Sequence, residues 1–93
     1  MNKKSYTVSH ILVQHEYEAQ DLLRKLEEGK SFEELARSFS KCPSSARGGE
    51  LGPIPIGAAD ENFEEAALAL GQNETTKAPV RSRFGYHLIS KKS

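Results

Sequence analysis

The chain has 93 residues, with 13 Lys and Arg against 13 Asp and Glu, and this length permits one modest core and therefore one domain, residues 1–93. The zero net charge argues against nucleic-acid binding, which favours a basic surface, and no apolar run approaches the roughly 20 residues of a membrane-spanning helix. The single cysteine excludes an internal disulfide and is typical of a reducing compartment, so we expect a cytoplasmic protein. We also expect the chain to be a monomer.

The first part of the chain predicts a strand followed by two helices. Residues 5–13 are rich in β-branched and aromatic residues and place apolar side chains on both faces, as a central strand does. A helical stripe follows at Ala19, Leu22, Leu23 and Leu26. Gly29 ends this helix, and Ser31 with Glu34 forms a capping box for a second one. The second stripe is Phe32, Leu35, Ala36 and Phe39.

The second part of the chain predicts a loop, a helix and two strands. Residues 42–57 hold three prolines and four glycines, which indicates a loop with at most a short strand near Leu51. Asn62 caps a third helix that ends at Gly71. Residues 77–80 and 86–90 predict strands around a turn. This order of elements predicts an α+β fold on a mostly antiparallel sheet.

Three titratable residues, His10, Cys42 and His87, stand where core residues are expected. Two histidines on neighbouring central strands can satisfy each other's ring nitrogens, which is the purely structural interpretation. The three residues also have the ligand types of a zinc site, without its paired spacing or a fourth ligand. A nucleophilic Cys/His pair would lack a third group to orient the base. The glycine-rich residues 47–52 match no phosphate-binding motif.

Four segments together resemble the parvulin peptidyl-prolyl cis/trans isomerases. In family order they are SHILV at 9–13, SKCPS at 40–44, RGGELG at 47–52 and FGYHLI at 84–89. The resemblance implies the βαααβαββ parvulin fold, with a four-stranded, mostly antiparallel sheet surrounded by helices and one short helical turn after Cys42. It also implies an isomerase that assists protein folding by rotating Xaa–Pro bonds, with no cofactor and no metal. Its partners would be proline-containing, unfolded or extended polypeptides.

The resemblance also implies roles for particular residues. His10 and His87 match the paired histidines beneath the active site, and Cys42 matches the active-site cysteine. Ser82 stands where the family usually has a threonine that helps hold the histidine network. The positions that match the substrate-binding wall are Leu51, Ala59, Phe63 and Phe84.

The wall departs from the family pattern at Ala59, where the family generally has a methionine. Ile54 or Ile56 is expected to fill the space that the smaller side chain leaves. The alternative function is therefore a catalytically weak module of the same fold that binds unfolded or proline-containing segments. A third interpretation is one domain of a larger exported foldase.

Charged residues bear on the choice of substrate. Phosphorylation-dependent parvulins carry Lys and Arg after the first strand to bind the phosphate, whereas residues 14–18 here hold two acids and no Lys or Arg. We therefore expect unphosphorylated substrates. Further along the chain, Asp60 and Glu61 are expected on one side of the substrate-binding groove, and Arg81 and Arg83 on the other side.

Overall fold

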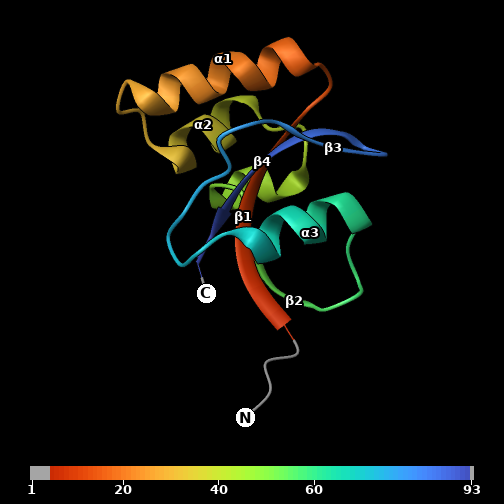
Figure 1. Ribbon diagram of the computed structural model, residues 1–93. Helices are drawn as coiled ribbons and strands as arrows, with labels where there is room; N and C mark the ends of the chain where they lie inside the picture. The colour runs from red at the N-terminus through yellow and green to blue at the C-terminus, as the bar shows by residue number, and fades with distance from the viewer. Residues whose placement is uncertain (1–4, 93) are drawn as a thin grey trace.

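The computed structural model describes residues 5–92 and shows a four-stranded sheet with helices against both faces (Figure 1). The strands are β1 (Ser5–Val13), β2 (Glu50–Pro55), β3 (Val80–Ser82) and β4 (Gly85–Lys91). The helices are α1 (Glu16–Glu27), α2 (Phe32–Phe39) and α3 (Glu61–Ala69), and a 3-10 turn, η1, covers Pro43–Arg47. The α+β class and the parvulin order of elements are confirmed. The domain boundaries 1–93 stay a prediction, because residues 1–4 and 93 lie outside the described part.

The sheet is antiparallel throughout, in the order β2-β1-β4-β3. β1 pairs with β2 over its first half and with β4 over its second half, so the prediction of a central first strand is confirmed. Because β1 starts beside the end of β4, the two ends of the described chain lie together, and Lys92 N donates to Thr7 O at 2.8 Å. Between residues 5 and 92 no helix is long and apolar enough to cross a membrane.

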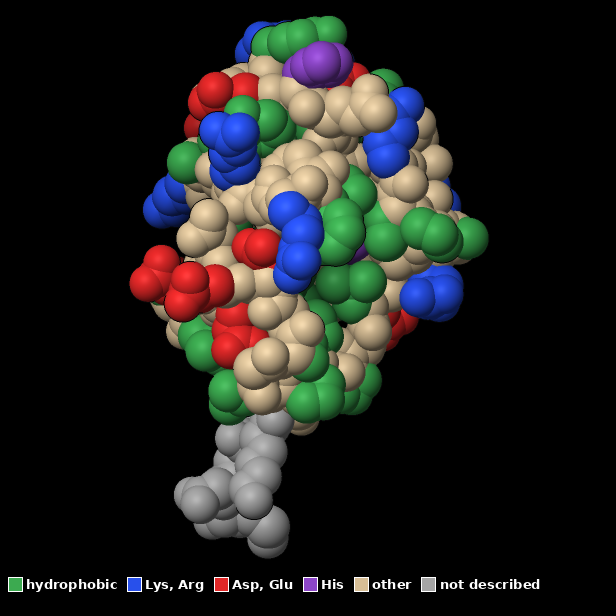
Figure 2. Space-filling model, turned by 90° about the vertical axis from the view of Figure 1, so that its right-hand side faces the viewer, with side chains coloured by type: hydrophobic (Ala, Val, Ile, Leu, Met, Phe, Trp, Pro, Cys, Tyr) green, Lys and Arg blue, Asp and Glu red, His purple; other side chains and the backbone are tan. Residues whose placement is uncertain are grey.

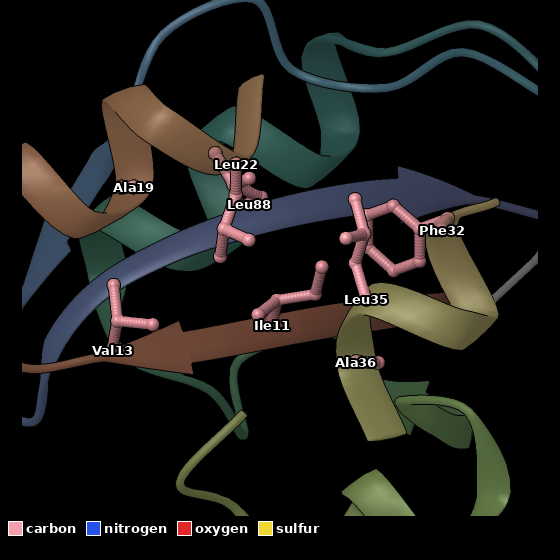
Figure 3. Close-up of a cluster of buried hydrophobic side chains, with 8 residues drawn as sticks. All are labelled: Ile11, Val13, Ala19, Leu22, Phe32, Leu35, Ala36 and Leu88. Carbon is pink, nitrogen blue, oxygen red and sulfur yellow. The ribbon is translucent and has the colours of Figure 1, made fainter. Parts of the chain in front are cut away.

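One face of the sheet carries the larger apolar core, which α1 and α2 cover (Figure 3). Ile11 and Val13 of β1 and Leu88 of β4 point to this face. The helices contribute Ala19, Leu22, Phe32, Leu35 and Ala36. Ser31 caps α2 as expected, since its Oγ accepts a hydrogen bond from Glu34 N at 3.2 Å. Phe39, predicted to belong to the buried stripe of α2, is instead 46% exposed.

The opposite face carries a smaller core beneath α3. It consists of Tyr6, Val8, Phe63, Ala67 and Ile89. The capping residue of α3 is Asp60 rather than the predicted Asn62, because the Asp60 carboxylate accepts from Asn62 N at 3.1 Å and starts the helix two residues earlier. The Asn62 amide instead donates to Arg81 O at 3.3 Å, which joins α3 to β3.

The strand predicted at residues 77–80 is wrong in position, since β3 runs from Val80 to Ser82. Pro79 has no N–H to donate to a ladder, which disfavours a strand through it. The segment just before it lies beside the end of β4 instead: Thr76 N donates to Ile89 O at 2.9 Å, and Ile89 N donates to the Thr76 hydroxyl at 3.0 Å.

The loop between α2 and β2 is fastened to β1 at Gly49. His10 N donates to Gly49 O at 2.9 Å, and Gly49 has φ +90°. A Cβ at this position would lie 2.4 Å from His10 O, so glycine is required by both the backbone angle and the close approach. This contact holds the loop beside His10.

Candidate functional site

One hollow, with a volume of about 470 Å³, brings together seven of the eight site residues that the sequence singled out. They are His10, Cys42, Leu51, Ala59, Phe63, Phe84 and His87. The eighth, Ser82, lies behind His87. We call this hollow the proline pocket, after the substrate group that the sequence resemblance leads us to expect there. Figure 2 shows the side of the molecule toward which the β3–β4 turn points; hydrophobic side chains gather in the middle of this face, with acidic and basic side chains beside them.

A row of three hydrogen-bonded side chains forms the base of the proline pocket. His10 Nδ1 and His87 Nδ1 lie 3.0 Å apart, and His87 Nε2 lies 2.6 Å from Ser82 Oγ. His10 stands diagonally across from His87 on neighbouring strands, and period-two alternation points both toward α3. The Ser82 hydroxyl also accepts from Phe84 N at 3.1 Å, so the row is tied to the β3–β4 turn.

The two histidines are neutral at pH 7. Burial, together with the neighbouring His87, lowers the pKa of His10 from its ordinary 6.5 to about 4. Burial also lowers the pKa of His87 to about 4, with the Asp60 carboxylate acting in the opposite direction. Each neutral ring has one N–H and one bare nitrogen, so one Nδ1 donates to the other. The tautomer of one ring therefore determines which nitrogen of the other ring carries its proton.

These two histidines predict how stability depends on pH. The unfolded chain binds protons near pH 6.5 and the folded pair does so only near pH 4, so stability is full above pH 6.5 and is lost as the pH falls from 6.5 toward 4. The slope is at most about 1.4 kcal/mol per pH unit for each extra proton on the unfolded chain. Urea unfolding at pH 7.5, 6.5 and 5.5 measures it while ordinary carboxylates stay ionised. His15→Asn is the control, because His15 is exposed and its replacement should leave the pH dependence of stability in place. Equal stability at all three pH values would contradict the assignment of neutral histidines.

Phe63 covers the histidine row from the α3 side. Its ring meets His10 edge-on, with the centroids 5.8 Å apart and the planes at 81°, and meets His87 at 5.1 Å and 78°. The side chain is 5% exposed and belongs to the smaller core. Phe63 therefore connects the wall of the proline pocket to the packing of α3.

Cys42 reaches the proline pocket from the start of η1. Ser40 positions this segment, because its hydroxyl accepts from Leu12 N at 3.0 Å and from Cys42 N at 3.4 Å. Lys41 N also donates to Leu12 O at 2.7 Å. The backbone around Cys42 is thus attached to β1 two residues beyond His10.

Loop residues 56–60 form the wall that contains Ala59. Gly57 N donates to both carboxylate oxygens of Glu64, at 2.9 and 3.0 Å, and Tyr6 Oη donates to Glu64 Oε1 at 3.0 Å. Burial, together with the Glu64 carboxylate, raises the pKa of Tyr6. Of the two isoleucines expected to replace the missing methionine, Ile54 lines the proline pocket and Ile56 is exposed.

Two of the four charged residues expected at the rim line the proline pocket. Asp60 and Arg83 are both in its lining, and their carboxylate and guanidinium groups lie 3.9 Å apart. Arg83 also lies over the Phe84 ring, with Cζ 5.6 Å from the centroid. The rim is therefore a close pair of opposite charges beside an exposed aromatic ring, and Glu61 and Arg81 are not part of the lining.

The zinc interpretation does not fit this geometry. Both ring nitrogens of His87 already have hydrogen-bond partners, and residues 5–92 contain no group of three His, Cys, Asp or Glu side chains placed to hold a metal ion. We did not predict from the sequence that Ser40 and Glu64 position parts of the site. Only the proximity of Ser40 to the Cys42 motif gave a signal for the first, and no local pattern marked the second.

Several known proteins are similar to this chain over most of its length. The family model for rotamase, described as the PPIC-type PPIase domain, matches residues 10–93. Foldase protein PrsA 1 of Bacillus cereus is 43% identical over 88 residues, which are 94% of this chain and 30% of the foldase. The chain therefore spans about 30% of the length of that relative.

Solved structures are similar over nearly the whole chain. The crystal structure of the peptidylprolyl isomerase PrsA from Bacillus anthracis matches with a TM-score of 0.92 and 41% identity, covering 96% of this chain and 41% of that one. The solution structure of NmPin, the parvulin of Nitrosopumilus maritimus, matches with a TM-score of 0.83 and 35% identity, covering 100% of both chains. The agreement includes the order of strands and helices that frames the proline pocket.

Proposed function

The chain belongs to the PPIC-type peptidyl-prolyl isomerase family, the parvulins, and we propose that its proline pocket accelerates cis/trans rotation about Xaa–Pro bonds of unphosphorylated polypeptides during their folding. One observation carries the proposal: an apolar wall faces two neutral histidines that are hydrogen-bonded to each other in the same hollow, with the Ser82 hydroxyl bonded behind His87. That combination suits a reaction in which no bond is made or broken.

The chemistry needed is modest. Rotation crosses a barrier of roughly 18–20 kcal/mol that amide resonance sets. The planar amide is more polar than the twisted one, so removing water from the bond favours the twisted form. Leu51, Ile54 and Phe63 supply the apolar surroundings for the proline ring.

The polar edge is assigned to Cys42 and to the histidine row. Cys42 lines the pocket at the start of η1, so we assign its thiol to the side of the rotating carbonyl, and we assign His10 and His87 to the base of the pocket, which their hydrogen bond holds in one shape. Ser82 acts through His87 as a positioning residue. Neutral rings suit this role, because a buried charge would favour the polar planar amide over the twisted one.

The preference for unphosphorylated substrates is supported by the rim. The carboxylate of Asp60 lies 3.9 Å from the guanidinium of Arg83, so a phosphate that approached this arginine would meet a negative charge as well. The first turn of α1, which follows β1 after two residues, contributes Glu16 and Glu18, and residues 14–18 contain no Lys or Arg.

Exchange NMR on proline peptides tests the proposal without a coupling protease. Unphosphorylated Xaa–Pro peptides should exchange faster with catalytic amounts of the protein, and matched phosphoserine–proline peptides should not. Binding shifts without faster exchange on every peptide would favour the alternative, a module that binds unfolded segments with little catalysis. No shifts and no faster exchange would contradict both functions.

Substituting Ala59 by methionine is expected to lower KM about threefold with little change in kcat. The longer side chain adds apolar contact to the wall, which strengthens binding of the planar and twisted forms alike. Steady-state rates on one Xaa–Pro peptide measure the change, and Ile56→Met is the control because Ile56 is exposed. An unchanged or higher KM would mean that Ile54 already fills the space.

We further propose a cytoplasmic setting and a monomeric state. Cys42 is a free thiol, which a reducing compartment preserves, and this supports the first part of the proposal. Fractionation of cells that express the native protein tests the location, and light scattering on the purified protein tests the monomer. Material outside the cytoplasmic fraction, or a mass of two chains, would overturn the respective part.

A further inference from the structure

Three exposed aromatic side chains lie apart from the cores; Phe84 belongs to the wall of the proline pocket, and the other two, Tyr17 and Phe39, have no role in the mechanism above. Tyr17 is 71% exposed, Phe84 is 65% exposed and Phe39 is 46% exposed. A single exposed aromatic residue is ordinary, whereas several along one path mark a binding surface.

These aromatic residues line a series of adjoining hollows that begins at the proline pocket. Arg83 and Phe84 line both the proline pocket and a second hollow of about 650 Å³, to which His15 and Tyr17 also contribute. Tyr17 in turn lines a third hollow, of about 460 Å³, together with Phe39. Each hollow thus shares an aromatic wall with the next.

The aromatic rings along this path are supported on their faces. The rings of His15 and Tyr17 stack with centroids 5.3 Å apart and planes at 11°, and the Arg83 guanidinium lies over Phe84. A ring that is already held loses little conformational freedom when a ligand packs against it. These are the properties of a preformed surface for apolar groups.

We propose that the second and third hollows extend the proline pocket, and that they bind aromatic or apolar side chains of an unfolded polypeptide some residues away from its proline. The proposal rests on the proposed function, because the occupant is the substrate chain itself. Continuity with the proline pocket identifies that occupant: Phe84 lines both the proline pocket and the second hollow, and Tyr17 is a further exposed aromatic ring in that otherwise mostly polar second hollow. An extended chain points alternate side chains to one side, so single aromatic residues at suitable spacing can use the hollows.

A peptide series tests the extension. Each peptide is unstructured and holds one Xaa–Pro bond with one Phe at increasing distance on either side, and matched peptides carry Ser at the same position. A tetrapeptide around the same proline is too short to reach beyond the proline pocket. For the spacing that fits, we expect kcat/KM to be about fivefold to tenfold higher for the Phe peptide than for its Ser partner.

Variants assign this gain to a surface. Tyr17→Ser should abolish the advantage of Phe over Ser while leaving the tetrapeptide rate within about twofold, and Tyr17→Phe should retain the advantage. Leu68→Ser is the matched control, since Leu68 is 44% exposed on α3 and lines neither hollow. The proposal is overturned if no spacing gives an advantage or if Tyr17→Ser keeps it. It is also overturned if Tyr17→Ser only dissolves a dimer, which would assign the surface to a second copy of the chain.

The two proposals fail in different ways. Absence of tetrapeptide catalysis would contradict the proposed isomerase function, whereas peptide affinities from NMR titration would still compare Phe with Ser and wild type with Tyr17→Ser. A normal tetrapeptide rate with no effect of Phe would contradict the extension alone.

Discussion

Replacing His87 with alanine is expected to lower kcat/KM on Xaa–Pro peptides about 100-fold and to lower the free energy of unfolding by about 3 kcal/mol. His87 joins the other two members of the row, so its loss leaves His10 Nδ1 and Ser82 Oγ without these partners at buried positions. It also removes one of the two rings that Phe63 packs against. NMR exchange rates and urea unfolding on the same samples measure the two effects.

A stability control separates these effects. Leu88 follows His87 on β4 but points to the opposite core, so Leu88→Ala should cost about 3 kcal/mol and leave kcat/KM of the folded protein unchanged. His87→Gln, which keeps a donor and an acceptor, should recover part of the activity. If His87→Ala lost no more activity than Leu88→Ala, the histidine row would be a structural feature only.

Replacing Phe63 with alanine is expected to cost about 4 kcal/mol of stability and to raise KM more than about tenfold. The side chain is almost wholly buried, belongs to the smaller core and lines the proline pocket, so one truncation opens a cavity and removes the apolar wall together. Phe63→Leu should give intermediate values of both quantities, because it restores part of the volume.

A control substitution for Phe63→Ala is available on the same helix, α3. Leu68→Ala, at an exposed position of α3, should change stability by less than about 0.5 kcal/mol and leave KM on a short peptide unchanged. A Phe63→Ala protein that is destabilised yet binds the peptide normally would show that Leu51 and Ile54 alone make the wall.

The sequence predicted the elements whose patterns are repetitive. β1 carries apolar side chains on both faces and α1 has an apolar stripe with a period of 3.6 residues, and both elements were placed correctly. The errors fall where local signals compete. Both Asp60 and Asn62 are suitable caps, and β-branched Thr75 and Thr76 pair with β4 although no strand pattern surrounds them. Only the position of the neighbouring strand decides between such alternatives.

The residues of the site could be predicted from the sequence, whereas the hydrogen bonds that hold its wall could not. The match to family motifs named His10, Cys42 and His87, and the structure brings all three to one hollow; their roles in the reaction stay predictions. The carboxylate of Glu64 holds the wall. Its partner Tyr6 is far away in sequence, and its partner Gly57 lies in the loop before α3. Contacts of this kind depend on how α3 packs on the sheet, which no local pattern specifies.

The pairing of the first and last strands has a consequence for how this domain can be built into other polypeptides. Thr7 and Lys92 are hydrogen-bonded neighbours, while two residues that line the proline pocket lie toward the other end of this strand pair, Leu12 near the end of β1 and Phe84 just before β4. A host protein could therefore accept the domain as a single insertion in one surface loop, because the entering and leaving segments need be no farther apart than two adjacent strands, about 5 Å. The inserted domain would present its open pocket away from the host.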